Sequence, residues 1–345
     1  MKILFACNSY YPNVGGAEKV CKDIVSLLQR SGHDVVVATQ PVVNRVDKKI
    51  VKEFQATSSY SKMRELKQYL DETPFDVYIS FGYGKYFSDV IGRFCRRHKK
   101  KSIFMPCGDF HTNQKSVTKR LYSILLGRKS FLNYDTIVTA TEWEKQHWIK
   151  KYHVPASKFV VIPYVLAPDF AKFRPTKIVS INALAPKEYL LYIGRTGPNK
   201  KVDWLIKAYM EGGCKIPLVI AGLGTDAEAL QDLAVKYCQQ NENIKFLGQI
   251  SENDKKTLIS NAKVCVFPST YESFGMVILE SIVLGTPVLL SDIPPFRELI
   301  KDNTVFFENT VDSIAERLVV YLSRQQSLPK VNFAKDMNKF LELIK

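Results

Sequence analysis

VCVFPSTYESFGMVILESIVLGTPVLL, residues 264–290, is the stretch that decides the fold. Its apolar start, Val264–Pro268, predicts a buried strand, and a polar loop follows. We expect a helix to open near Gly275 and to end at Gly285, because glycine readily adopts the left-handed conformation that closes helices. Pro287–Leu290 then begins another strand. A strand, crossover helix and strand in this order are typical of a parallel sheet.

The same alternation of short apolar runs and longer helix-like segments extends along the whole chain. It predicts an α/β fold with two doubly wound, Rossmann-like halves. The predicted strands are Lys2–Cys7, Asp34–Thr39, Asp76–Ser80, Ser102–Pro106, Thr136–Ala140 and Phe159–Pro163, then Tyr189–Gly194, Ile216–Ala221, Ile244–Leu247, Val264–Pro268 and Pro287–Leu290.

A length of 345 residues suits two domains. Residues 167–187 contain three prolines and little periodicity, so we interpret them as a linker between domains at 1–166 and 188–328. Val331–Lys345 has apolar residues at helical spacing, and one face of that helix must be buried. Residues 329–345 are therefore predicted to form a C-terminal helix.

The composition, 46% hydrophobic and 24% charged, excludes disordered and collagen-like chains. The seven cysteines are scattered, with no C-x-x-C pair and no cluster of Cys and His at zinc-finger spacing. This pattern favours a reducing cytosol, and we expect no metal site. The run Ile3–Cys7 is too short for a signal sequence, and no stretch is long enough for a transmembrane helix. We expect a cytoplasmic protein that reaches a membrane only from its surface.

The net charge of +15 is concentrated in one half of the chain. Residues 1–165 hold 27 Lys and Arg against 14 Asp and Glu, so 27 − 14 = +13, whereas the remaining residues hold 22 and 20, so 22 − 20 = +2. Such an asymmetry indicates that one domain faces a polyanion: nucleic acid, anionic lipid or a phosphorylated substrate.

The helix predicted at Gly275 follows the carboxyl end of a parallel strand, where unpaired amides and the helix dipole favour an anion. Two carboxylates bracket this point, Glu272 just before the helix and Glu280 inside it. With a diphosphate at the helix start, Glu280 could accept hydrogen bonds from a ribose diol, while Glu272 faces the group on the other phosphate. Taken alone, the spacing also fits two solvated helix-edge charges.

A second cluster, Arg195 and Lys200, lies in a Gly- and Pro-containing loop after the predicted strand Tyr189–Gly194. Two fixed cations there would neutralise charge that develops on a departing diphosphate. A solvated basic turn is the alternative interpretation of these two residues.

Together, G-R-x4-K at 194–200 and Y-E-S-F-G-x4-E-S-x3-G-T-P-V at 271–288 resemble the retaining, nucleotide-sugar-dependent glycosyltransferases of group 1, which have the GT-B fold. The resemblance implies two domains facing across a cleft, a last helix that returns to the first domain, and metal-independent catalysis by Arg195, Lys200 and Glu272. It implies no cofactor beyond the nucleoside-diphosphate sugar itself. It also implies a donor site of Gly15, Gly16, Arg195, Lys200, Gly248, Glu272, Ser273, Phe274, Gly275, Met276, Val277 and Glu280.

The N-terminal half matches this family only in outline. Gly15-Gly16 precede a predicted helix at Glu18–Arg30 and allow close approach of a ligand to its start. Many relatives carry a histidine after the fourth strand of this domain, where this sequence has Cys107 or Gly108. Asp109 and His111 are the candidates to replace it on the acceptor side, and ordinary solvated loop residues are the alternative.

The basic excess gathers in Arg93–Lys101 and in Lys115–Lys129. The second stretch interleaves five cations with Val117, Leu121, Tyr122, Ile124, Leu125 and Leu126, a pattern typical of an amphipathic helix resting on an anionic membrane. A solvated helix with its apolar side buried in the protein is the alternative.

We therefore expect a glycosyltransferase that acts on a lipid-linked or phosphorylated glycan in cell-surface polysaccharide synthesis, at the cytoplasmic face of a membrane. A nucleotide-sugar epimerase of the same fold remains an alternative. A basic nucleic-acid-binding protein is a further alternative, but the sequence has no recognition motif for nucleic acid, and we expect no nucleic-acid partner. No motif here determines the donor base, the sugar or the linkage.

Overall fold

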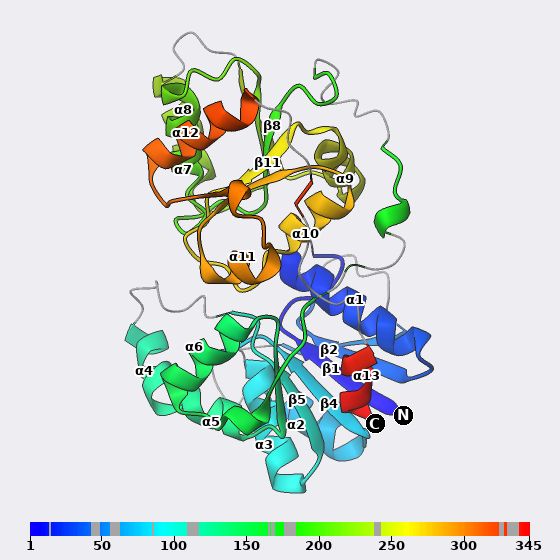
Figure 1. Ribbon diagram of the computed structural model, residues 1–345. Helices are drawn as coiled ribbons and strands as arrows, with labels where there is room; N and C mark the ends of the chain where they lie inside the picture. Colours follow the sequence, from blue (N-terminus) through cyan, green and yellow to red (C-terminus); the bar gives the residue numbers. More distant parts are fainter. Residues whose placement is uncertain are drawn as a thin grey trace. The chain divides into compact units, whose positions relative to one another are not determined.

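The computed structural model describes residues 1–13, 15–42, 49–55, 63–84, 86–108, 117–164, 166, 170–175, 184–237, 243–323, 328–329 and 338–345. The chain divides into two compact units (Figure 1). Unit 1 consists of Met1–Val165 with Ala334–Lys345, and unit 2 of Leu166–Phe333. The residues predicted to be a linker therefore group with unit 2.

Unit 1 is built on a parallel sheet of seven strands in the order β3-β2-β1-β4-β5-β6-β7. The order reverses between β1 and β4, as in a doubly wound fold. The strands are β1 (Lys2–Cys7), β2 (Asp34–Thr39), β3 (Val51–Glu53), β4 (Val77–Phe81), β5 (Lys101–Met105), β6 (Thr136–Thr139) and β7 (Phe159–Val161).

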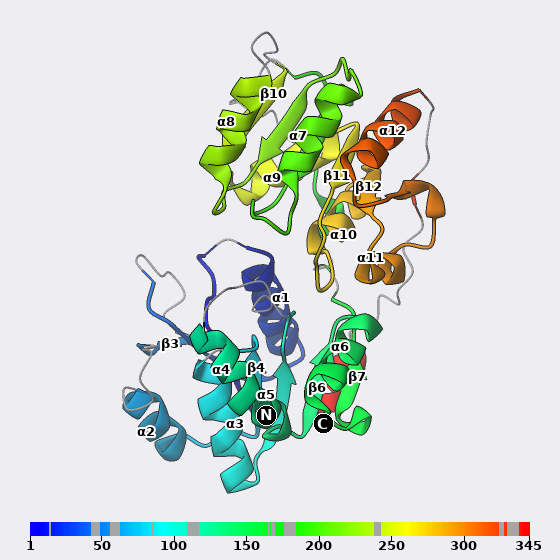
Figure 2. The same ribbon diagram turned by 90° about the vertical axis from the view of Figure 1, so that its left-hand side faces the viewer.

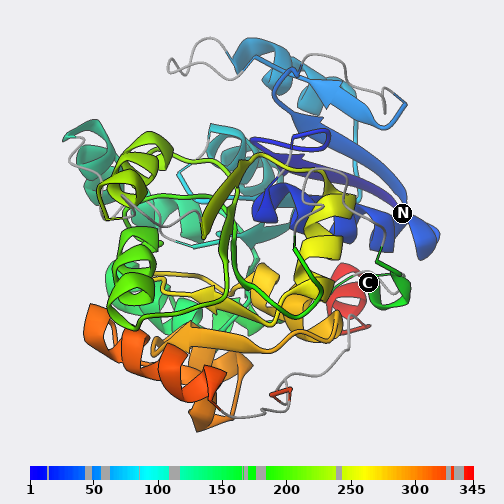
Figure 3. The same cartoon turned by 90° about the horizontal axis from the view of Figure 1, so that it is seen from above.

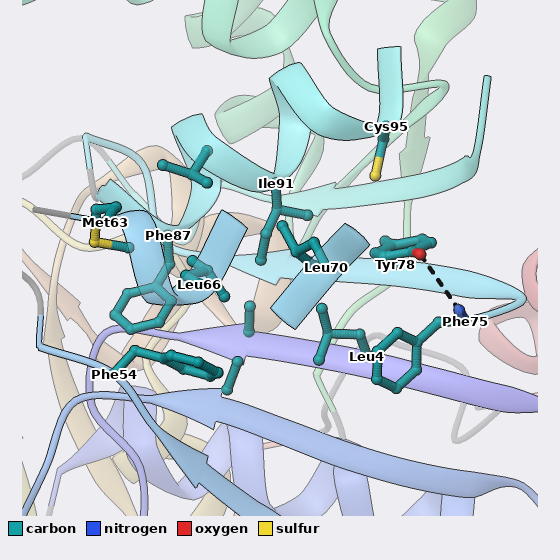
Figure 4. Packing of buried hydrophobic residues seen from close by; sticks show 13 residues of the cluster. Leu4, Phe54, Met63, Leu66, Leu70, Phe75, Tyr78, Phe87, Ile91 and Cys95 are labelled. Atoms are coloured by element: carbon teal, nitrogen blue, oxygen red, sulfur yellow. Dashed lines mark hydrogen bonds between the residues drawn. The ribbon is translucent and has the colours of Figure 1, made fainter. Parts of the chain in front are cut away.

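Helices cover this sheet because its central strands are apolar on both faces; β4, for example, is buried at every position. The helices are α1 (Gly16–Arg30), α2 (Arg64–Glu72), α3 (Tyr86–His98), α4 (Val117–Leu125), α5 (Gly127–Leu132), α6 (Glu142–Tyr152) and α13 (Asn338–Ile344). Figure 4 shows one core cluster, in which Leu66 and Leu70 of α2 meet Phe87 and Ile91 of α3 above Leu4 of β1.

Unit 2 repeats the architecture with six parallel strands in the order β10-β9-β8-β11-β12-β13, so its order reverses between β8 and β11. Its strands are β8 (Leu190–Ile193), β9 (Leu218–Ala221), β10 (Ile244–Gly248), β11 (Val264–Phe267), β12 (Val288–Ser291) and β13 (Phe306–Phe307). Its helices are α7 (Val202–Glu211), α8 (Ala227–Tyr237), α9 (Glu252–Asn261), α10 (Met276–Val283), α11 (Pro294–Leu299) and α12 (Val311–Leu322).

The predicted fold class is confirmed, and all eleven predicted strands occur with ends within two residues of those expected. Sequence patterning missed β3 and β13, which are edge strands of three and two residues. The deciding helix α10 ends at Val283 and its C-cap is Leu284, one residue before the predicted cap. Gly285 follows with φ +81°, and its amide donates to the carbonyl of Ile282 at 3.0 Å.

The C-terminal helix α13 packs within unit 1. Phe340 and Ile344 are buried, Lys101 Nζ donates to the Ile344 carbonyl at 2.9 Å, and Lys339 Nζ donates to the Val161 carbonyl at 3.4 Å. Both chain ends accordingly lie near each other in Figure 3 as in Figure 1. Residues 330–337 of the predicted helix lie outside the described residues.

The single basic helix predicted over Lys115–Lys129 is wrong, because the chain forms two helices, α4 and α5, that meet at Leu126. Gly127 starts α5 against the ring of Tyr152, and a β-carbon at Gly127 would collide with that ring. The close packing of α5 on Tyr152 therefore requires glycine at position 127.

Candidate functional site

The carboxyl edge of the unit 2 sheet gathers four loops at the point where the strand order reverses. The loop after β8 carries Arg195 and Lys200, and the loop after β11 carries Glu272. Because β8 and β11 are neighbours in the sheet, these two loops lie side by side. In doubly wound sheets this switch point is where ligands bind.

Hydrogen bonds through Asn199 join the β8 loop to the β11 loop. The Thr270 amide donates to the Asn199 carbonyl at 2.8 Å, and Asn199 Nδ2 donates to the Tyr271 carbonyl at 3.3 Å. The two segments recognised from the sequence are therefore fixed to each other. Asn199 could not be singled out from the sequence, because its carbonyl and its side-chain amide both bond to a loop about seventy residues away.

Two glycines after β9 bring a third loop against the first. A β-carbon on Gly222 would overlap the carbonyl oxygen of Gly194, and one on Gly224 would overlap that of Thr196. The Gly222 amide also donates to the Gly248 carbonyl at 2.7 Å, so Gly248, with φ +60°, anchors the fourth loop. Gly248, a predicted donor residue, is thus part of the backbone framework of this edge.

Lys200 and Glu272 form an ion pair across the two loops. Each side chain is about one-fifth exposed, and Ser269 Oγ donates to the same Glu272 oxygen at 3.3 Å. Arg195 is exposed; its carbonyl accepts from the Tyr192 hydroxyl at 2.7 Å, and within the described ranges no residue accepts a hydrogen bond from its guanidinium. The structure therefore pairs Lys200 with Glu272 and leaves the Arg195 head available to an anion.

The amino end of α10 opens beside this ion pair. Gly275 has φ +99° and provides no side-chain cap. Among the described residues, none accepts a hydrogen bond from the Met276 or Val277 amide. Unpaired amides at a helix start attract an anion. Ser273 and Phe274, also predicted donor residues, are largely buried beneath this loop.

Gly275→Ala is expected to lower the free energy of unfolding more than Gly285→Ala does. Both substitutions place a side chain on left-handed backbone, at a cost of about 1–2 kcal/mol. At Gly275 the new β-carbon would also meet Ile278 and Phe296 at 2.9 and 3.0 Å, whereas nothing lies within 4 Å at Gly285. Urea unfolding should show the greater loss of stability for Gly275→Ala. Equal losses for the two variants would contradict this account of the helix start.

Glu280 lies one turn inside α10 and is almost fully buried. Lys255 of α9 contacts both of its carboxylate oxygens at 3.2 Å and also reaches Glu252 at 2.9 Å. Burial lowers the pKa of Lys255, but the charges of Glu280 and Glu252 outweigh it and hold that pKa above its usual value. The buried Glu280 carboxylate therefore lies beside the charged ammonium group of Lys255. No local pattern could have identified Lys255, which lies far from Glu280 in the sequence.

In unit 1, Gly15 and Gly16 begin α1, which has no side-chain cap. Gly15 is extended, with φ 173°, so its glycine identity is not required by a left-handed conformation. Contact of Gly15 and Gly16 with the sugar donor stays a prediction. Asp109 and His111 lie outside the described residues.

The described part of the loop after β5 includes two left-handed residues, Cys107 with φ +55° and Gly108 with φ +81°. The Gly108 amide donates to the buried Glu144 at 2.6 Å, and the Ala140 amide donates to the same carboxylate at 3.1 Å. Burial raises the pKa of Glu144, although these two backbone hydrogen bonds lower it. Glu144 therefore fixes the backbone at Gly108, one of the two residues predicted to stand in place of the histidine of the resembled family.

Within the described parts of the chain, no group of three or more His, Cys, Asp or Glu side chains could hold a metal ion. Over the same residues, the structure contains no helix with the length and apolar character needed to cross a bilayer.

Comparison with known proteins gives matches in both units. The profile of the family described as glycosyl transferases group 1 matches residues 174–339, and that of glycosyltransferase family 4 matches residues 14–168. An O-antigen chain mannosyltransferase B from Escherichia coli is 27% identical over 253 residues, which cover 70% of this chain and 64% of that protein.

A GDP-mannose-dependent alpha-(1-6)-phosphatidylinositol dimannoside mannosyltransferase from Mycobacterium tuberculosis is 29% identical over 56% of this chain and 51% of its own length. The matched region thus spans less than two thirds of both curated relatives. The Anabaena protein HepE, solved in complex with UDP and glucose, has the same fold, with a TM-score of 0.72 at 18% identity over 93% of this chain and 90% of that chain.

Proposed function

The chain belongs to the glycosyl transferases group 1 family of the GT-B fold, and from this premise we propose that it transfers a hexosyl group from a nucleoside-diphosphate sugar to a glycan acceptor. One observation carries the proposal. A single edge of the unit 2 sheet holds two cations, the unpaired amides of α10 and two carboxylates in an arrangement suited to a sugar diphosphate.

In the proposed complex, the diphosphate lies on the Met276 and Val277 amides, with Arg195 and Lys200 at its oxygens. Glu280 accepts hydrogen bonds from the ribose hydroxyls. When the bond between sugar and phosphate breaks, negative charge grows on the diphosphate, and the helix end and the cations stabilise it. The departing phosphate then accepts the acceptor's proton on the face it leaves, so the sugar keeps its anomeric configuration.

Glu272 has a second role in this proposal, because its carboxylate forms an ion pair with Lys200. An arriving diphosphate must displace the carboxylate from Lys200. The displaced carboxylate is then available to the hydroxyls of the sugar. The exchange couples binding of the phosphate to placement of the sugar.

Glu272→Gln is therefore expected to tighten binding of a sugar-free nucleoside diphosphate while lowering turnover. An ion pair of this exposure contributes up to about 1 kcal/mol, which corresponds to roughly a fivefold gain in affinity when the competing charge is removed. Calorimetry on wild type, Glu272→Gln and the control Ser269→Ala measures the effect. Weaker binding by Glu272→Gln than by wild type would show that no such competition exists.

We propose a lipid-linked acceptor and a mannosyl donor as the first substrates to test. The names of the two curated relatives support the mannosyl group, and one of them acts on a phosphatidylinositol dimannoside. The excess positive charge of residues 1–165, 27 − 14 = +13, supports an acceptor carried by an anionic surface. Unit 1 is the proposed acceptor-binding unit.

The test is an assay of donor consumption with GDP-mannose and UDP-glucose, with and without a bacterial lipid extract. The proposal predicts that nucleoside diphosphate is released only when acceptor is present, and that proton NMR of the product shows the donor's anomeric configuration. An epimerase would instead convert the donor sugar without acceptor. If no nucleotide sugar gives either release of nucleoside diphosphate or conversion of the sugar, the proposed activity is wrong.

A further inference from the structure

The outward side of α4 is apolar. Val117, Leu121, Ile124 and Leu125 are 71%, 50%, 71% and 62% exposed. Their spacing places them on one side of the helix, which we call the apolar face of α4. Figure 2 shows α4 beside α3 and α5, on the surface of unit 1.

The inward side of α4 is polar, which is the reverse of an ordinary surface helix. The Tyr122 hydroxyl donates to the two Asp89 oxygens at 2.9 and 2.7 Å, and Ser123 Oγ lies 2.6 Å from the Tyr152 hydroxyl. Ser130 Oγ donates to the same Asp89 at 2.6 Å. These buried hydrogen bonds fix the rotation of α4 about its axis, so the apolar face cannot turn inward without breaking them.

In the sequence around the apolar face, every charged residue is a cation. Arg120 of α4 and Arg128 and Lys129 of α5 are exposed. No Asp or Glu occurs anywhere from Phe110 to Tyr134. An apolar strip followed in the chain by exposed cations is complementary to a surface with an apolar interior and anionic head groups.

The other basic stretch predicted from the sequence lacks this combination. Arg96, Arg97 and Lys99 at the end of α3 are exposed, but no large apolar side chain of residues 93–101 is. Exposed apolar residues also occur on α12, Val319 and Val320, but there they follow the acidic Glu316.

We propose that α4 docks unit 1 on an anionic lipid surface, with its apolar face among the acyl chains and Arg120, Arg128 and Lys129 among the phosphates. This inference rests on the proposed function in one respect: the docking would serve to bring the enzyme to a lipid-carried acceptor. The docking itself requires nothing of the donor site in unit 2.

The test is co-sedimentation of the full chain with vesicles of phosphatidylcholine alone or with phosphatidylglycerol added. Wild type should bind only the anionic vesicles, and less at high salt. Leu121→Gln/Ile124→Gln/Leu125→Gln should lower the partition coefficient by at least about tenfold, and Arg128→Gln/Lys129→Gln should weaken both the binding and its salt dependence. The matched control, Val235→Gln/Val319→Gln/Val320→Gln, changes three exposed apolar residues elsewhere and should bind as wild type.

Wild-type levels of vesicle binding by the α4 triple variant would overturn the proposal, as would wild type that binds no vesicle. A dimer that the triple variant dissociates, with vesicle binding unchanged, would assign the face to a second copy of this chain instead. The single variant Ile124→Asp keeps the test open if the triple variant fails to fold. Calorimetry with nucleoside diphosphate on the same proteins reports on the donor site separately, so failure of docking and failure of the proposed function are distinguishable.

Discussion

Arg195→Ala/Lys200→Ala is expected to lower turnover by about 10³-fold or more while the free energy of unfolding changes by no more than about 1 kcal/mol. The two side chains contribute little to the packed core, because Arg195 is exposed and Lys200 pairs with Glu272 at a partly exposed site. In the proposed complex both cations contact the bound diphosphate, and they stabilise it most as further charge develops on it. The effect should therefore appear in kcat rather than in stability.

The matched control is Lys236→Ala/Lys301→Ala, which removes two exposed cations of unit 2 outside the four loops. If turnover depends on the net charge of the unit, both double variants should lose activity alike. If the β8 loop holds the diphosphate, only the first should. Full activity of Arg195→Ala/Lys200→Ala would remove both residues from the site.

Lys255→Met is expected to cost about 3–5 kcal/mol of stability, because it leaves the buried Glu280 carboxylate without its neighbouring cation. Nucleotide affinity should fall with it, since Lys255 holds both oxygens of Glu280 in place. Glu252→Gln is the control, because it removes the exposed carboxylate that shares the same lysine. We expect that control to cost less than about 1 kcal/mol.

Two further variants separate stability from binding. Lys255→Arg restores a cation and should recover nucleotide affinity in part. Lys255→Met/Glu280→Met replaces the buried pair by apolar side chains and should recover most of the stability, but not nucleotide binding. Thermal unfolding and calorimetry give the two readouts. Recovery of nucleotide affinity by the apolar pair would contradict a role for Glu280 at the ribose.

The strands were predictable because parallel strands buried on both faces are continuous apolar runs, as Leu190–Ile193 and Val264–Phe267 are. β13 is two residues long and carries too short a pattern to detect. The break between α4 and α5 was not predictable either. Gly127 follows this break, and its contact with the ring of Tyr152 exists only in the folded chain.

The sequence predicts which residues form the site but not which of them pair with one another. The two motifs identify Lys200 and Glu272 separately, but only the folded loops show that they form an ion pair. Lys255 belongs to no motif, and its place beside Glu280 follows from the packing of α9 on α10. For α4, the sequence permits the apolar side to face either way. The hydrogen bonds of Tyr122 and Ser123 decide that it faces outward.

A crystal structure of the protein with a bound nucleoside diphosphate tests the central claim most directly. The account predicts phosphate oxygens within hydrogen-bond distance of the Met276 and Val277 amides, Lys200 moved from Glu272 to the phosphate, and both ribose hydroxyls on Glu280. A nucleotide bound at another edge of the sheet, or one at this edge with Glu280 still remote from the ribose, would contradict it.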